Sequence, residues 1–471
     1  MNYIFILFGS DSTYEAQVMS KFMDEMPHGT NVFCFISDIP EVYIKKSENI
    51  TTIINKSRED NETALNTVIE DGEISAIFIF DFNKIFFTPE FEHEYKTLNF
   101  DLRWLEKIKA PINIIDTLDF FDYDPDKKIK LRSSGKYNPE NYSFNDTEIF
   151  TEDTISIKSM KENESESNET NQTKRKSTMF DNKDMISSRY DFFPNIIKLS
   201  PPVDVEPKET AKFLYWNYSN VDYENQDTDM MKAPLGINDS TKNVFLMFSP
   251  AMQLQSIINN KAGYYMRVIE VLIRHLKTLD ENINLFIGSQ GKDPIIDTWI
   301  KGTKIKYRAF TALGYDMYKT MILYCDALIT DTSWNPSLID AACLKKPAGV
   351  IGSSFFFNES GEAQSNFEYT DPEIVKILDL SIKNFPQEFF PFTSYPLSEE
   401  NEIKFGFHDE KYPYYLLDIY SSESVLAFFD EFMIRKEEVF DELNKELHFF
   451  SKRGEKALST SELLNLFSDV N

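Results

Sequence analysis

The sequence has few cysteines and no framework that they could form. Only three of its 471 residues are cysteines, namely Cys34, Cys325 and Cys343, and each lies in an apolar stretch. Such residues are typical of small core side chains in a reducing compartment. We therefore expect free thiols and a cytoplasmic location.

Basic residues and long apolar runs are also scarce. Lysine and arginine number 49 against 77 acidic residues, which gives a net charge of −28. Nucleic acids and anionic membranes attract basic patches, so this charge argues against both as partners and is most simply a source of solubility. The apolar run Tyr3–Phe8 is far shorter than the roughly 20 residues of a membrane-spanning helix. It also lacks a basic segment before it, so we expect neither a signal peptide nor a transmembrane segment.

Apolar residues make up 42% of the chain, which is enough for real cores in about two or three domains. Apolar strand-like runs alternate with helical segments on both sides of a polar stretch, a pattern typical of α/β domains with parallel sheets. The polar stretch is rich in Glu, Asn, Ser and Lys, and such a composition indicates disorder. We predict a Rossmann-like domain (1–126), a disordered low-complexity insertion (127–187), a crossover or linker (188–240), a second Rossmann-like domain (241–392) and a C-terminal helical segment (393–471).

The most informative stretch is Phe310–Ser354. Ala327–Thr330 is predicted to be a buried strand, and a polar turn follows it. Pro336 suits the first turn of the next helix, because its missing N–H costs nothing there. A second strand, Ala348–Ile351, completes a strand–helix–strand unit of a parallel sheet.

At these residues the chain resembles the donor-binding half of GT-B glycosyltransferases, which are built from two Rossmann-like domains facing a cleft. The resemblance rests on Met321, Asp326, Ile329-Thr330, Asp340-Ala341 and Pro347, and it covers about residues 240–355. It implies an acceptor side in the first domain and a donor side in the second. It also implies a last helix that crosses back onto the first domain, a nucleotide-sugar donor and an acceptor of unknown identity.

Ligands of open parallel sheets bind beyond the carboxyl ends of the strands, so we place candidate residues in the turns there. Asp11 follows the first strand, where the resemblance implies the catalytic base. The alternative is that Asp11 and Ser12 only cap the next helix, in which Ser12 and Glu15 would form a capping box. Ser249 and Gln253 occupy the turn that donates hydrogen bonds to the donor diphosphate in the family, or else an ordinary strand–helix turn.

The turn after Thr330 supplies the other candidates for donor binding. Thr332, Ser333 and Asn335 suit a diphosphate at a helix N-terminus. Trp334 would stack on the nucleobase, or alternatively block the site or serve packing. Asp340 replaces the family's glutamate, and we expect it in the first turn of its helix, accepting hydrogen bonds from the ribose. The alternative is a carboxylate that only balances the helix dipole.

No metal site or cofactor is predicted. The five histidines are scattered without ligand spacing. Asp122-Tyr123-Asp124 matches the metal-binding pattern of another transferase class, but it borders the acidic insertion and we assign it no role. Three hypotheses remain, namely a metal-independent glycosyltransferase, a sugar-nucleotide epimerase, and a non-catalytic protein that binds a nucleotide sugar or a partner. Arg267, Arg274 and Lys292 are too scattered to favour the epimerase.

Overall fold

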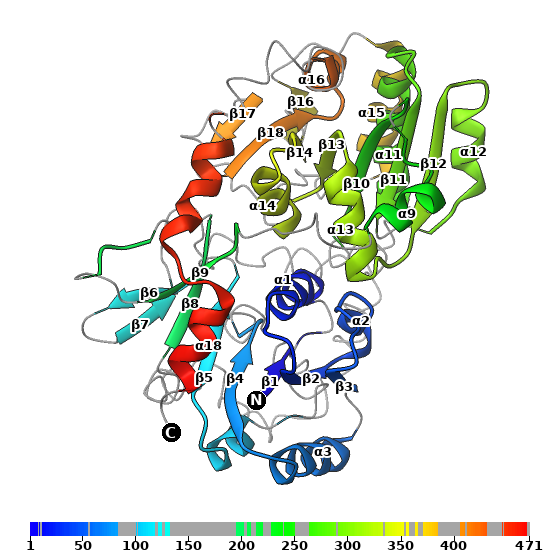
Figure 1. Cartoon of the computed structure of the whole chain (residues 1–471). Helices are drawn as coiled ribbons and strands as arrows, with labels where there is room; N and C mark the ends of the chain where they lie inside the picture. Colours follow the sequence, from blue (N-terminus) through cyan, green and yellow to red (C-terminus); the bar gives the residue numbers. More distant parts are fainter. Residues whose placement is uncertain are drawn as a thin grey trace, which may run out of the picture.

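The computed structural model describes residues 1–82, 100–131, 195–249, 263–332, 335–384, 406–430 and 445–468, with short gaps inside these ranges. The described chain forms two halves, each built around a seven-stranded sheet (Figure 1). This architecture confirms the prediction of two Rossmann-like domains with parallel sheets. The predicted insertion 127–187 lies outside the described residues except for Lys128–Leu131, which is a strand.

The first sheet has the strand order β3-β2-β1-β4-β5-β8-β9, and all of its strand pairs are parallel. Its elements are β1 (Asn2–Ile6), α1 (Thr13–Asp24), β2 (Asn31–Ile36), α2 (Asp38–Glu41), β3 (Ile50–Ile54), α3 (Arg58–Glu70), β4 (Ile74–Ile79), η1 (Leu102–Lys107), β5 (Ile112–Asp116), β8 (Asn195–Ser200) and β9 (Leu214–Asn217). A short antiparallel hairpin, β6 (Phe121–Asp124) and β7 (Lys128–Leu131), follows β5.

The second sheet has the order β12-β11-β10-β13-β14-β18-β17, in which only β17 is antiparallel. The elements of this half are α9 (Thr228–Leu235), β10 (Lys242–Met247), α11 (Gly263–Thr278), β11 (Ile283–Gly288), α12 (Pro294–Ile300), β12 (Ile305–Phe310), α13 (Tyr315–Tyr324), β13 (Ala327–Thr330), α14 (Pro336–Cys343), β14 (Ala348–Gly352), β15 (Phe355–Phe357), β16 (Ala363–Ser365), α15 (Pro372–Asn384), β17 (Gly406–Asp409), β18 (Tyr412–Asp418) and α16 (Ser422–Phe429). Strands β15 and β16 lie outside the large sheet and pair with each other in a separate antiparallel hairpin.

Alternation along the strands explains why the sheets are buried on both faces. In β1, Tyr3 and Phe5 belong to one hydrophobic cluster, whereas Ile4 and Ile6 belong to another on the opposite face. The first cluster contains Phe22 of α1 and the second contains Leu65 of α3, so a helix covers each face. A strand buried on both faces reads as a continuous apolar run, which is why these strands could be found from the sequence.

Two segments lie elsewhere than expected. We assigned 188–240 to a crossover or linker, but β8 and β9 extend the first sheet beside β5. The C-terminal segment, predicted to be helical, contributes β17 and β18 to the second sheet. Pro413 argues against a central strand, yet the pairing of β18 with β14 begins only at Tyr415, so the missing N–H lies outside it.

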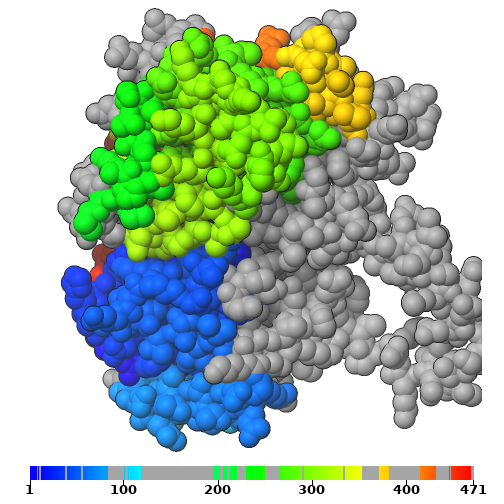
Figure 2. Space-filling view, turned by 90° about the vertical axis from the view of Figure 1, so that its right-hand side faces the viewer, coloured from blue at the N-terminus to red at the C-terminus, as the bar shows by residue number. Residues whose placement is uncertain are grey.

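The chain ends on the first half, as the resemblance implied. After η4 (Arg453–Lys456), helix α18 (Thr460–Ser468) packs beside β4 and β9 (Figure 1). The ring of Phe467 lies 5.9 Å from that of Phe78, centroid to centroid. The two halves also touch directly, because α1 contacts α14. In Figure 2 the yellow-green second half rests on the blue first half.

Candidate functional site

An aspartate marks the switch point of each sheet, where the strand order reverses and ligands of such sheets bind. In the second half this residue is Asp331, which follows β13 and is fully buried. Its carboxylate accepts a hydrogen bond from the backbone N–H of Ser249 at 2.8 Å and from the Tyr265 hydroxyl at 3.0 Å. Burial raises the pKa of Asp331 to about 7, although these hydrogen bonds oppose that rise. Asp331 therefore fixes the turn after β10 against the start of the next loop.

In the two turns that were predicted to bind the donor, backbone N–H groups are hydrogen-bonded within the protein. The N–H of Ser249 is bound by Asp331, and the N–H of Thr332 donates to the Thr330 hydroxyl at 3.0 Å. We expected backbone N–H groups of the second of these turns to meet a diphosphate, but that of Thr332 is satisfied within its own turn. Ser249 and Thr332 are both buried.

Asn335, in contrast to Ser249 and Thr332, is the N-cap residue of a helix, α14. Its side-chain oxygen caps α14, accepting from the backbone N–H of Ser337 at 3.0 Å and from the Ser337 hydroxyl at 2.7 Å. Pro336 occupies the first turn, as predicted. The Asn335 side chain is buried, and its amide nitrogen has no hydrogen-bond partner among the residues that the structure describes. A buried donor at a helix N-terminus is suited to an anionic group.

Four of the candidate residues, Asp11, Gln253, Ser333 and Trp334, lie outside the described residues. Among the remaining candidates, the hydrogen bond to Asp331 joins the turn of Ser249 to the segment of Thr332, and Asn335 follows three residues later at the start of α14.

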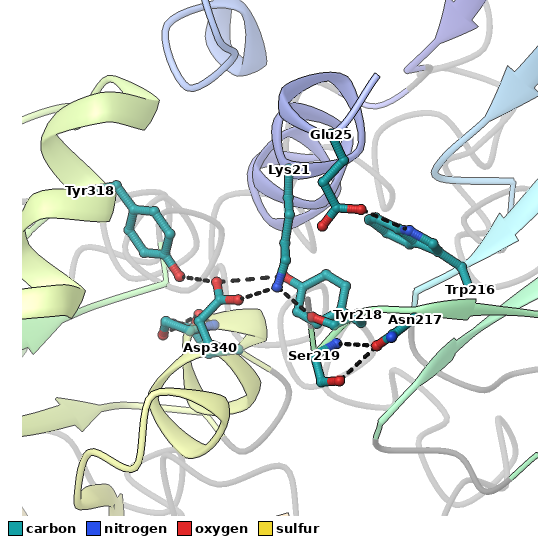
Figure 3. Close-up of polar contacts among 10 residues, drawn as sticks. Lys21, Glu25, Trp216, Asn217, Tyr218, Ser219, Tyr318 and Asp340 are labelled. Atoms are coloured by element: carbon teal, nitrogen blue, oxygen red, sulfur yellow. Dashed lines mark hydrogen bonds and ion pairs between the residues drawn. The ribbon is translucent and has the colours of Figure 1, made fainter. Parts of the chain in front are cut away.

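Asp340 lies in the second turn of α14, whereas we predicted the first. The helix begins only at Pro336, so Asp340 is its fifth residue. It is buried, and its carboxylate faces the first half (Figure 3). One oxygen accepts from the Lys21 ammonium at 3.0 Å, and the other accepts from the Tyr318 hydroxyl at 2.7 Å. The expected ribose acceptor is thus engaged by protein groups.

Lys21 of α1 is held from several sides. Its ammonium also donates to the backbone carbonyl of Tyr218 and lies 3.6 Å from the centre of that tyrosine's ring. A second ion pair crosses the halves, because the Lys319 ammonium of α13 lies 2.9 Å from Asp24 of α1. Both lysine side chains are buried, so these are buried ion pairs in which loss of one partner is costly.

Helix α1 carries both of the ion pairs between the halves that are described above. Besides Lys21 and Asp24, it carries Tyr14, which lies close enough to Asp331 for that carboxylate to raise the pKa of the tyrosine, although burial is the larger cause. The predicted capping box is wrong. Ser12 makes no cap hydrogen bond to α1, because its hydroxyl donates to Asp81 instead.

Sequence reasoning missed Asp331 and Lys21. A signal for Asp331 was present, because the apolar runs of β4 and β13 both end in an aspartate, Asp81 and Asp331. No comparable signal marks Lys21. It looks like an ordinary helix lysine until the second half is packed against it.

The structure offers no metal centre among its described residues. The candidate epimerase arginines are engaged elsewhere, since Arg267 and Arg274 both pair with Glu270 on α11. No helix in the described part of the chain has the length and apolar character of a membrane span. The three cysteines are free thiols.

Fold and site together define a two-domain α/β protein with GT-B-like topology and a polar site at the switch point of its second sheet. Residues 172–452, more than half of the chain, match the family of unknown function DUF6365, and the chain belongs to this family. No curated protein matches the sequence.

Several solved structures have a similar fold. MurG of Acinetobacter baumannii is 9% identical with a TM-score of 0.40, and all of both chains is covered. HepE of Anabaena, in complex with UDP and glucose, is 9% identical with a TM-score of 0.44 and covers 100% of this chain and 98% of its own. The UDP-GlcNAc 2-epimerase of Methanocaldococcus jannaschii is 8% identical with a TM-score of 0.42, covering 95% and 100%.

Proposed function

We propose that this protein is a metal-independent glycosyltransferase of the cytoplasm. It takes a sugar from a nucleotide-sugar donor bound to its second half and passes it to an acceptor whose identity is unknown. The observation that carries the proposal is the unpartnered amide nitrogen of Asn335, buried at the N-terminus of α14 beside the switch point. This nitrogen and the helix dipole would hold the donor diphosphate.

The other candidate residues have roles in this proposal. The diphosphate contacts Ser249, Gln253, Thr332 and Ser333, and the nucleobase stacks on Trp334. Asp340 accepts hydrogen bonds from the ribose hydroxyls. Asp11 takes the proton from the acceptor hydroxyl as that oxygen attacks the sugar, and the nucleoside diphosphate leaves.

Replacing Asn335 tests the donor site. Asn335→Asp keeps the cap of α14, because asparagine and aspartate are equally good N-cap residues. The change removes the amide donor and adds negative charge where the diphosphate would lie. We expect affinity for UDP-glucose or GDP-mannose, measured by calorimetry, to fall at least about tenfold, since hydrogen bonds to charged groups contribute roughly 1.5–3 kcal/mol. The melting temperature should barely change.

Asp293→Asn is the matched control, because Asp293 caps α12 in the same way, accepting from the N–H of Ile295. It should leave affinity unchanged. Equal affinity of wild type and Asn335→Asp would reject Asn335 as the diphosphate donor. Asp11→Asn should abolish release of UDP from UDP-glucose while binding persists.

A non-catalytic binding protein is the second candidate. The Lys21–Asp340 pair favours it, because the group assigned to the ribose already has partners within the protein. Binding of a nucleotide sugar without any release of nucleoside diphosphate, in the presence of varied acceptors, would support this candidate over the transferase.

A further inference from the structure

In the two ion pairs between the halves, each half supplies one lysine and one aspartate. They join Lys21 to Asp340 and Lys319 to Asp24, and thus connect α1 of the first half with α13 and α14 of the second. Figure 3 shows the first of them, with Lys21 extending from α1 toward Asp340. A buried charge that loses its partner normally destabilises a protein strongly, which would make such an interface permanent.

The charges of the first half, however, each have a second partner within that half. Lys21 also donates to the Tyr218 carbonyl. Its attraction to Glu25, the C-cap residue of α1, lowers the pKa of Glu25 against the larger opposing effect of burial. Asp24 is also paired with Lys45. Separation of the halves would therefore leave neither Lys21 nor Asp24 alone.

The same holds for the charges of the second half. Lys319 lies 3.4 Å from Asp316 on its own helix, and Asp340 accepts from the Tyr318 hydroxyl. After separation, Asp340 would lose Lys21 and the longer hydrogen bond from the Tyr218 hydroxyl, which is 3.5 Å. It would keep Tyr318 and have one carboxylate oxygen open to another donor. Each charge thus has one partner across the interface and another within its own half. The halves can therefore be joined or separated without leaving any of these charges unpaired.

We propose that Lys21 is a lock on the donor site, and that the nucleotide must displace it from Asp340. This inference rests on the proposed function, in which Asp340 accepts from the ribose. In the closed protein the Lys21 ammonium occupies the position of the ribose hydroxyls. Binding of the nucleotide separates Lys21 from Asp340, leaves it with the Tyr218 carbonyl and Glu25 as partners, and loosens the contact between α1 and α14.

Lys21→Met tests the lock through affinity. Removing the competitor should tighten binding of UDP-glucose or GDP-mannose, and couplings between two sites typically amount to about 5- to 150-fold. Lys198→Met is the matched control, because Lys198 is an equally buried lysine that faces Asp116 within the first half. It should leave affinity unchanged. If Lys21→Met does not fold, Lys21→Gln keeps a donor for Asp340 without the charge.

Small-angle X-ray scattering without ligand tests the lock independently of the donor. The radius of gyration should increase for Lys21→Met and stay at the wild-type value for Lys198→Met. An unchanged radius for Lys21→Met would overturn the lock. Separated halves with unchanged affinity would overturn the competition for Asp340. If no variant binds either nucleotide sugar, the proposed donor site fails, whereas scattering still decides whether Lys21 holds the halves together.

Discussion

Asp81 in the first half and Asp331 in the second occupy equivalent positions. Asp81 lies just after β4, which pairs with β1, and Asp331 lies just after β13, which pairs with β10. Asp81 accepts from the N–H of Gly9 at 2.8 Å and from the Ser12 hydroxyl. Both of these partners belong to the turn after β1. Asp331 accepts from the turn after β10 but also from Tyr265 of α11.

The difference shows that topology fixes where the carboxylate lies, whereas the turn decides what it does. The first turn uses the Ser12 hydroxyl for Asp81, so α1 begins without a side-chain cap. The second half keeps the two tasks apart, because Asp331 braces the turn after β10 and Asn335 caps α14. The halves also differ in their contact with the C-terminal helix, because α18 packs against β4 and β9 of the first half.

Removing the two aspartates gives the largest expected effect. Asp81→Ala and Asp331→Ala each leave two donors without their acceptor, which we expect to lower the free energy of unfolding by about 3 kcal/mol. Urea denaturation measures this. The comparison would fail if only one of the two variants lost stability. Asp331→Asn should lose less than Asp331→Ala, because its amide oxygen still accepts from Ser249.

A glycine near the chain end tests whether the first half depends on that end. A Cβ on Gly454 would lie 2.5 Å from the side chains of Asn217 and Ser219 and 2.7 Å from the backbone oxygen of Ser200. Gly454→Ala should therefore destabilise the protein by about 2 kcal/mol through overpacking. Gly302→Ala is a poor control because of its positive φ, and Gly314 is the N-cap of α13, where alanine is unfavourable. Gly291→Ala serves instead, because its Cβ would meet only the methyl group of Thr311 at 3.4 Å. Equal unfolding curves for the two variants would contradict the close approach.

The same junction gives a pH dependence. The Glu25 carboxylate accepts from Thr460 of α18, and burial raises its pKa to about 7 from an ordinary value of 4.5. Between these values the folded protein holds a proton that the unfolded chain has lost, so this residue's contribution to stability falls as pH rises from about 4.5 to 7.

Glu25→Gln removes this titration. The stability of Glu25→Gln relative to wild type should therefore increase by roughly 2 kcal/mol from pH 5 to pH 8, because one pKa unit corresponds to about 1.4 kcal/mol. Urea unfolding at several pH values measures this difference. Glu462→Gln on α18 is the control, because hydrogen bonds from Ser459 lower the pKa of Glu462, so its titration lies below this window. A constant difference between wild type and Glu25→Gln across this range would show that Glu25 titrates elsewhere.

The smallest expected effect concerns metals. Asp122 and Asp124 lie on β6, in the hairpin that follows β5 of the first half, and the donor is assigned to the second half. Excess EDTA, and the variant Asp122→Asn, should both leave the affinity for UDP-glucose unchanged. A loss of binding that magnesium restores would assign the first half a role in holding the donor.

The sequence by itself determined the two parallel sheets and the strand–helix–strand unit around α14. Apolar runs such as Ile74–Ile79 and Ala327–Thr330 are long enough to identify buried strands locally, and Pro336 marks a helix start in the same local way. The cap by Asn335 is equally local, because it involves only Ser337, although we predicted a donor-binding role for Asn335 and no cap.

Only the tertiary structure decided the partners of Ser12 and Asp340. Both residues fit a local pattern, a capping box and a helix carboxylate, yet each is bound by a residue distant in sequence, Asp81 and Lys21. The strand β18 was missed because we predicted the C-terminal segment to be helical. Pro413 is tolerated there because the pairing with β14 begins only at Tyr415. Hydrogen bonds and ion pairs between remote segments depend on how the sheets and halves pack, and neither spacing nor composition records that packing.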